Sequence, residues 1–178
     1  IAAVMLNKNF LVQEIESSHI EALTFALSKM GAKLKINKNS IQIMPSKNLN
    51  GIKIHTAPYP GFPTDLQAQI MALMSLANSN SQIKENIFEN RFMHVPELNR
   101  LGAKIKVKKD IAHIVGNRNF KGAQVMASDL RASVSLVLAA LCAEGESVIN
   151  RIYHLDRGYE RIENTLGKLG PSIKREKY

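Results

Sequence analysis

An internal repeat constrains the fold of this sequence more than any other feature. Three similar segments read LSKMGAKLK, NRLGAKIK and GKLGPSIK, and their glycines are Gly31, Gly102 and Gly170, which lie 71 and 68 residues apart. A glycine just beyond a helix adopts the left-handed conformation without steric cost, and an alternating apolar pattern is typical of a half-buried strand. Each segment therefore predicts a helix that ends at its glycine and is followed by a strand.

A second repeated pattern predicts the start of a longer helix in two places. After both Asp65–Leu66 and Asp129–Leu130, apolar residues follow the leucine at offsets of 4, 7, 8 and 11, which is one face of an α-helix. Residues 1–6 are typical of the end of a third such helix. Alternating patterns predict further strands at residues 10–15, 40–44, 82–88, 111–115 and 147–153.

Together these patterns define a repeating unit of helix, strand, helix, strand and strand. The units cover approximately residues 1–48, 49–116 and 117–178, and the first lacks its beginning. Because parallel strands need crossover connections, this order predicts an α/β protein with mixed sheets covered by shared helices. Ile1 falls inside an apolar stretch, so we expect the chain to be a fragment of a longer protein.

Composition excludes several other classes of protein. Apolar residues make up 45% and charged residues 22% of the chain, which is typical of a globular domain. The single cysteine, Cys142, excludes a disulfide framework and lies in an apolar helix, and the five histidines have no metal-ligand spacing. No glycine-rich nucleotide motif is present. The apolar runs are too short to span a bilayer and no secretory signal is found, so we expect a cytoplasmic location.

The net charge of +9 leaves nucleic acid, membrane surfaces and anionic small molecules open as ligands. It arises from 24 Lys and Arg against 15 Asp and Glu. The positive charges are spread over all the repeats, and the stripe Lys104, Lys106 and Lys108 lies on one face of a predicted strand, where it favours solubility. A basic nucleic-acid-binding module is therefore an alternative that the charge distribution does not favour.

The most unusual segment is a proline-rich loop before the second helix. Three of the six prolines fall within residues 58–63, directly before Thr64 and Asp65. Proline fixes φ, so the loop is expected to be stiff and to bring both side chains to the start of a helix. The simpler interpretation is that Asp65 caps that helix, but a cap does not need three prolines, so a role as acceptor of a substrate hydroxyl proton stays open.

Further charged residues lie at matching places in the repeat. Asp129 and Arg131 start the helix of the next unit, where a helix cap with a surface ion pair is the simpler interpretation. Arg91 and Arg157 each lie where a predicted strand leads into the helix before a repeat glycine. Arginine at such a place is either solvated or binds a phosphate or carboxylate in a bidentate manner.

Four longer motifs carry a resemblance to a known family. They are PGFPTDLQAQ at 60–69, IFENRFMHVPEL at 87–98, GAQVMASDLRAS at 122–133 and RIYHLDRGYERIE at 151–163. In this order they resemble the UDP-N-acetylglucosamine 1-carboxyvinyltransferases, a family of enolpyruvyl transferases that acts in bacterial peptidoglycan synthesis and hence in cell wall formation, cell shape and division. The resemblance implies an inside-out α/β barrel, in which two similar domains each contain three repeated units. This chain would be part of one such domain, from the C-terminal portion of the enzyme.

The resemblance also implies an activity and its substrates. The family transfers the enolpyruvyl group of phosphoenolpyruvate to the 3′-hydroxyl of UDP-N-acetylglucosamine and releases phosphate, without a metal or an organic cofactor. The related enzymes that act on shikimate 3-phosphate are the alternative within the same fold, and the motifs at 87–98 and 151–163 favour the nucleotide sugar.

The residues implied by the resemblance are the charged groups noted above and one further position. Asp65 matches the aspartate that binds the sugar hydroxyl and acts as base, with Thr64 beside it, and Ile87 matches a backbone contact to the UDP-sugar. Arg157 matches the arginine that closes over the phosphate of phosphoenolpyruvate. The remaining matches to charged active-site residues are Arg91, Asp129 and Arg131.

Several functional groups of the family have no match in this chain. The reactive cysteine, the lysine and asparagine that bind phosphoenolpyruvate and most uridine contacts belong to other parts of the enzyme, and Cys142 does not match the motif of that cysteine. We therefore expect the missing parts of the enzyme to be partners of this chain, and the chain alone to be inactive.

Overall fold

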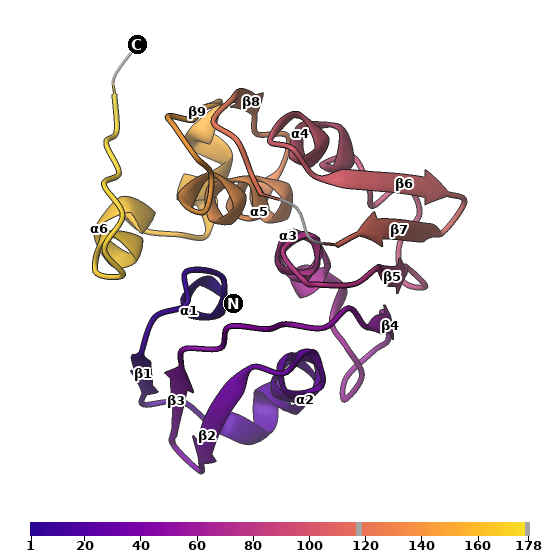
Figure 1. The fold of residues 1–178 in the computed structure, drawn as a ribbon, viewed down its shortest axis with the longest axis vertical. Coiled ribbons are helices and arrows are strands. Elements are labelled where there is room, and N and C mark those ends of the chain that lie inside the picture. Colours follow the sequence, from indigo (N-terminus) through magenta and orange to yellow (C-terminus); the bar gives the residue numbers. More distant parts are fainter. Residues whose placement is uncertain (117–118, 177–178) are drawn as a thin grey trace.

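The computed structural model describes residues 1–116 and 119–176. Its middle part, which contains a complete repeat, is the clearest guide to the architecture (Figure 1). The elements there are β4 (Lys53–His55), η2 (Thr64–Leu66), α3 (Gln67–Ser75), β5 (Ser81–Lys84), α4 (Val95–Arg100), β6 (Lys104–Lys108) and β7 (Ile111–Val115). They form a four-stranded sheet in the order β4-β5-β7-β6, in which β4 and β5 are parallel and the other pairs are antiparallel. The prediction of a mixed sheet is confirmed.

The parts before and after repeat portions of the same pattern. The first part contains α1 (Ala2–Met5), β1 (Phe10–Gln13), η1 (Ser17–Ile20), α2 (Glu21–Met30), β2 (Lys33–Asn37) and β3 (Ser40–Met44). Its sheet has the order β1-β3-β2, which matches β5-β7-β6. The last part contains β8 (Gln124–Met126), α5 (Leu130–Leu141), β9 (Val148–Asn150), η3 (Ile152–Arg157) and α6 (Ile162–Gly167). Its parallel pair β8-β9 matches β4-β5.

The repeat glycines adopt the predicted conformation. Gly31 is the C-cap of α2 with φ of 95°, and Gly102 and Gly170 have φ of 103° and 109° shortly after α4 and α6. Strands β2 and β6 follow the first two glycines as predicted. The alternating segment after Gly170 forms no strand within the described residues 171–176, where no returning strand lies beside it as β3 does for β2.

Two strands are additional to the predicted unit. β4 and β8 come before α3 and α5, and each has only three residues, which is too short for alternation to be recognised. The predicted strands at 82–88 and 147–153 are also shorter, since β5 ends at Lys84 and β9 ends at Asn150. The complete unit is therefore strand, helix, strand, helix, strand and strand.

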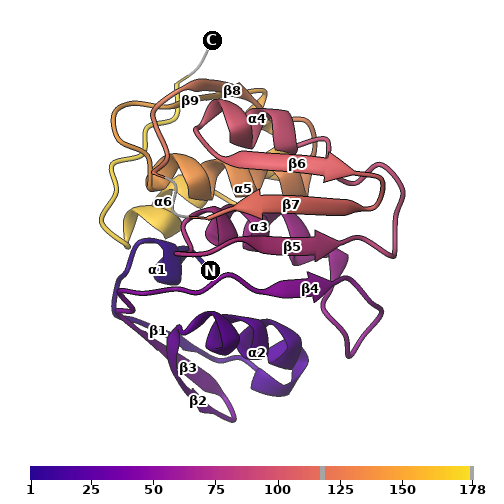
Figure 2. The same ribbon diagram turned by 45° about the vertical axis from the view of Figure 1, so that its right-hand side comes forward.

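Helices α3 and α5 occupy the inside of the molecule, and the sheets lie towards its outside. All nine residues of α3 are buried, and α3 packs between the β4–β7 sheet and α5 (Figures 1 and 2). The other two sheets lie at opposite ends of the molecule in Figure 1. Within the described residues the three sheets remain separate and close no barrel. The structure thus has the α/β character and the inside-out order expected for part of such a domain.

One finding concerns membranes. Among residues 1–116 and 119–176, no helix combines the length and the apolar character that crossing a bilayer requires.

Candidate functional site

The proline-rich loop is closed at its base and leads directly into the candidate site. Thr56 and Phe62 form a β-bridge, and the backbone N–H of Ala57 donates to the carbonyl oxygen of Phe62 at 2.9 Å. The chain then turns through η2 into α3, so that Asp65 lies in the first turn of η2. Neither η2 nor α3, both fully within the described chain, has a side-chain cap, so the capping interpretation of Asp65 is wrong.

The carboxylate of Asp65 instead binds two arginines. Arg91 donates from Nη2 to Oδ1 at 3.4 Å, and Arg131 donates from Nε to the same oxygen. Arg91 follows β5 and Arg131 lies in the first turn of α5, so the cluster joins the second repeat to the third. The side chain of Asp65 remains 61% exposed. The structure therefore brings together three of the predicted site residues around a carboxylate that solvent and small molecules can reach.

The two arginines are held from different directions. The Arg91 guanidinium lies 4.8 Å from the centre of the Phe88 ring, a cation–π contact that orients it. The hydrogen bond to Asp65 raises the pKa of Arg131, although partial burial opposes this shift. The two guanidinium groups are therefore suited to bind an anionic ligand.

Asp129 is the N-cap of α5, as the simpler interpretation of the sequence predicted. Its Oδ1 accepts hydrogen bonds from the backbone N–H groups of Arg131 at 2.9 Å and Ala132 at 3.0 Å. Burial acts to raise the pKa of Asp129, but these two bonds, a bond from Ser128 and the nearby His94 together hold that pKa below its usual value. The cap fixes the backbone from which the Arg131 side chain extends to Asp65.

His94, which the sequence did not single out, lies between these charged groups. It is 4% exposed and directly precedes α4, and its Nε2 has no hydrogen-bond partner among the described residues. Burial lowers the pKa of His94 to about 4. The charge of Asp129 opposes that shift and the charge of Arg91 adds to it. The imidazole is therefore neutral near neutral pH.

Glu85 is a second buried residue that the sequence did not single out. It is 4% exposed, and its carboxylate accepts hydrogen bonds from the hydroxyl groups of Thr56 at 2.7 Å and Thr64 at 3.0 Å. The backbone N–H of Ile87 also donates to it at 2.9 Å. The sequence predicts one strand over residues 82–88, in which Glu85 is an ordinary alternating position. In the structure β5 ends at Lys84, and Glu85 begins a loop.

Within the described residues, Arg157 makes no hydrogen bond or ion pair with this cluster, although the adjoining Gly158 lies against Leu130 at the start of α5. Arg157 is the last residue of η3 and is exposed, and within residues 1–116 and 119–176 it forms no ion pair. Its neighbour Asp156 is bound by Arg175 with N–O distances of 2.8 and 2.9 Å. The structure thus gathers Thr64, Asp65, Ile87, Arg91, Asp129 and Arg131 through direct or shared contacts but does not bring Arg157 to them.

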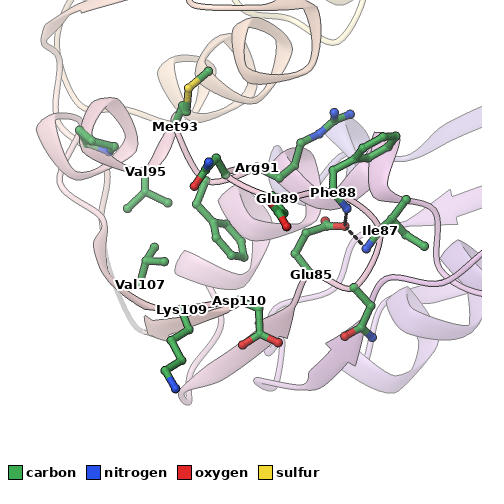
Figure 3. Close-up of a pocket in the computed structure, with 14 residues that line it drawn as sticks. Glu85, Ile87, Phe88, Glu89, Arg91, Met93, Val95, Val107, Lys109 and Asp110 are labelled. Carbon is green, nitrogen blue, oxygen red and sulfur yellow. Dashed lines mark hydrogen bonds between the residues drawn. The ribbon is translucent and has the colours of Figure 1, made fainter.

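A cavity opens beside the loop that follows β5. Its volume is about 830 Å³, and it is lined by residues 85–93 and by the turn between β6 and β7 (Figure 3). Figure 3 shows the bonds from Glu85 to the backbone of Ile87 and Phe88, which shape the rim of the cavity. A space of this size falls within the range of small-molecule binding pockets.

Metal binding and cysteine chemistry are two further kinds of chemistry to compare with the structure. Within the part of the chain that the structure describes, no group of three or more His, Cys, Asp or Glu residues is arranged to hold a metal ion. Burial raises the pKa of the Cys142 thiol to about 11, which makes it a poor nucleophile. The arrangement is suited to proton transfer and to the binding of anions.

Comparisons with known proteins agree on one family. The sequence profile of EPSP synthase (3-phosphoshikimate 1-carboxyvinyltransferase) matches residues 1–166. Relatives named UDP-N-acetylglucosamine 1-carboxyvinyltransferase are 57% identical in Pelagibacter ubique, over 98% of this chain, and 48% identical in Myxococcus xanthus, over 99%. The chain spans 42% of the length of each of these two relatives.

Solved structures agree with the fold. The enolpyruvyl transferase NikO from Streptomyces tendae has a TM-score of 0.89 at 26% identity, and the match covers 97% of this chain and 41% of NikO. EPSP synthase from Acinetobacter baumannii has a TM-score of 0.77 at 17% identity, over 99% of this chain and 44% of that protein. The helices and sheets described above therefore have the arrangement found in part of these larger proteins.

Proposed function

Since this chain belongs to the EPSP synthase (3-phosphoshikimate 1-carboxyvinyltransferase) family, we propose that it forms part of an enzyme that transfers the enolpyruvyl group of phosphoenolpyruvate to UDP-N-acetylglucosamine. The acceptor is the 3′-hydroxyl of the sugar and phosphate is released, in a cytoplasmic step of peptidoglycan synthesis. Relatives 48–57% identical to the chain carry this activity in their names, which favours the nucleotide sugar over shikimate 3-phosphate.

The observation that carries this proposal is the position of Asp65. A stiff loop holds its exposed carboxylate against Arg91 and Arg131. A group that can accept a hydroxyl proton therefore lies beside two cations. The carboxylate accepts the proton of the sugar hydroxyl while the hydroxyl oxygen attacks phosphoenolpyruvate, and the arginines bind the negative charges of the substrates. In this addition the oxygen bonds to C2 of phosphoenolpyruvate and C3 takes up a proton. The tetrahedral intermediate then loses a proton from C3 together with phosphate, which restores the double bond.

The other predicted residues have supporting roles in this proposal. Asp129 orients Arg131 through the helix cap, and Ile87 contacts the nucleotide sugar through its backbone at the rim of the cavity. Arg157 binds the phosphate of phosphoenolpyruvate and must approach the cluster when the substrates are bound. The segments that the longer relatives possess beyond this match supply the remaining groups and the second domain.

The proposed domain organisation follows the same logic. Residues 1–178 form a partial enolpyruvyl transferase domain with units at 1–48, 49–116 and 117–178. Each range holds one of the three sheets, which supports these boundaries. The boundary near residue 117 coincides with residues 117–118, which lie outside the described part of the chain.

The proposal is tested with the full-length protein by measuring phosphate release from phosphoenolpyruvate in the presence of each acceptor. We expect turnover with UDP-N-acetylglucosamine and none with shikimate 3-phosphate. Asp65→Asn should lower kcat by about 100-fold or more, since it removes the proton acceptor, while the exposed side chain leaves the melting temperature unchanged.

Glu21→Gln is the matched control for this experiment. Glu21 is also an exposed carboxylate in the first turn of a helix, α2, but it lies outside the cluster, so activity should be retained. Turnover with shikimate 3-phosphate alone, or an Asp65→Asn variant as active as the wild type, would contradict the proposal.

A further inference from the structure

We propose that Glu85 is a positioning residue that fixes the Thr64–Asp65 turn and the Ile87 backbone relative to each other, and thereby sets the affinity for the nucleotide sugar. This inference rests on the proposed function. The side chain of Glu85 is buried, so it acts through the residues that it contacts.

The carboxylate joins three segments of the chain. Its Oε1 accepts from the Thr56 hydroxyl at 2.7 Å, at the base of the proline-rich loop, and from the backbone N–H of Ile87 at 2.9 Å. The N–H of Phe88 donates to the same oxygen at 3.3 Å. Its Oε2 accepts from the Thr64 hydroxyl at 3.0 Å, at the far end of the loop. One side chain therefore connects both ends of the loop to the rim of the cavity.

The number of donors explains why an acidic residue is present here. All four partners donate, so a group that only accepts, on both oxygens, satisfies each of them. A buried carboxylate is tolerated only when it is hydrogen-bonded in this way. An amide at the same place keeps the bonds to one oxygen but presents an N–H₂ group to the Thr64 hydroxyl. Glu85→Gln therefore weakens the link to the Asp65 turn while it retains size and shape.

The contacts of Glu85 also predict which substrate is affected. Thr64 adjoins Asp65, the proposed acceptor for the sugar hydroxyl, and Ile87 is the proposed backbone contact to the UDP-sugar. No hydrogen bond or ion pair within the described residues connects Glu85 to Arg157, the proposed phosphate ligand. A change at Glu85 should therefore alter the KM for one substrate and not for the other.

The test is steady-state kinetics of the full-length enzyme with both substrates varied. Glu85→Gln should raise the KM for UDP-N-acetylglucosamine about tenfold, as expected for a disturbed bond to a charged group, and change the KM for phosphoenolpyruvate less than about twofold. Thr64→Val removes the same link from the other side. It should give the same selective change, and the double variant should be no worse than either single one.

Two controls separate positioning from general stability. Glu97→Gln alters another carboxylate that accepts a backbone N–H at 2.9 Å, from Met126, outside the cluster, so neither KM should change. Thr56→Val removes a buried bond to Glu85 at the base of the loop and should lower the melting temperature without the selective change in KM.

The outcomes distinguish the inference from the proposed function. An inactive wild-type protein contradicts the proposed function itself. The positioning role is contradicted if the wild type is active and the Glu85→Gln and Thr64→Val variants only contain less active protein, with both KM values unchanged. It is also contradicted if both KM values change equally. If Glu85→Gln does not fold, Thr64→Val decides the question, because it leaves the other three bonds to the carboxylate in place.

Discussion

Single side chains in this molecule take their properties from contacts that are distant in sequence, and His94 is a clear example. It is buried near the charges of Arg91 and Asp129, and its Nε2 has no hydrogen-bond partner in the described part of the chain. Such an imidazole is stable only while it is neutral. Protonation of His94 therefore opposes folding.

This environment predicts acid sensitivity in a defined pH window. The ordinary pKa of 6.5 falls to about 4 in the folded His94, so between these values the unfolded chain binds a proton that the folded chain does not. The free energy of unfolding should decrease by about 3 kcal/mol as the pH falls from 6.5 to 4, with no further loss from this group below 4. Urea unfolding of the full-length protein at several pH values measures this decrease.

The contribution of His94 is isolated with a variant. His94→Gln should have a smaller decrease over the same window, and His113→Gln, on the exposed face of β7, is the matched substitution. Asp129 does not interfere, because its lowered pKa means that its stabilising charge is lost only at pH values below 3.8. Equal pH dependence in the wild type and His94→Gln would contradict this prediction.

Two variants of Asp129 distinguish its role as a helix cap from the role of its negative charge. Asp129→Ala removes the acceptor for the N–H groups of Arg131 and Ala132 and should cost about 1 kcal/mol of stability. Asp129→Asn keeps a capping oxygen, so most of that stability should remain. If the negative charge also matters for the reaction, Asn should lower kcat as much as Ala does. Thermal melts and kinetics of both variants measure the two effects, and a stability loss that is equal in the two would contradict the capping role.

The sequence predicted the exposed charged residues of the site better than the buried ones. The pattern Asp-Leu at a helix start is the same at Asp65 and Asp129, yet only Asp129 caps its helix. At Asp65 the 3-10 turn η2 precedes α3, so that Asp65 is not at the N-cap position, and its carboxylate binds Arg91 and Arg131 from other elements. Glu85 and His94 were not predicted because their roles depend on burial, which no local sequence pattern shows.

At the scale of helices and strands, the predictions based on the repeat held where the pattern was long enough. The repeat glycines and the hairpins β2–β3 and β6–β7 could be predicted because the left-handed glycine and the alternation are local signals. β4 and β8 could not be predicted, since they are three residues long and are stabilised by pairing with strands that lie 29 and 24 residues further along the chain.

Gly102, the repeat glycine of the second unit, gives a direct test at this scale. Gly102 has φ of 103°, and a Cβ there would lie 3.1 Å from the carbonyl oxygen of Asn119. Gly102→Ala should therefore lower the free energy of unfolding by about 1 kcal/mol or more. The change is measured from the midpoint of urea unfolding.

Gly167 provides the contrast, because it is the last residue of α6 and a Cβ there meets no atom within 4 Å. Gly167→Ala should leave stability unchanged or increase it slightly, since alanine favours the helix. A Gly102→Ala variant as stable as Gly167→Ala would show that the backbone does not require glycine at the repeat position.

At the scale of the whole molecule, the candidate site is exposed and incomplete. Asp65 is 61% exposed, Arg157 makes no ion pair with it among the described residues, and the chain spans 42% of the length of the two relatives compared above. We therefore expect the 178-residue chain alone to show no enolpyruvyl transfer. Phosphate release by the isolated chain at high concentration measures this, with the full-length protein as the positive control. Measurable turnover by the chain alone would contradict the expectation.

The bonds around Asp65 differ greatly in the length of chain that they close. The contact with Arg91 spans 26 residues and stays within one repeat, whereas the contact with Arg131 spans 66 residues and requires the next repeat to be in place. Closing a longer loop costs more conformational entropy, so contacts within a repeat form before those between repeats. We accordingly expect the cluster around Asp65 to be among the last parts of the chain to assemble, so that its formation would report the docking of the second repeat against the third.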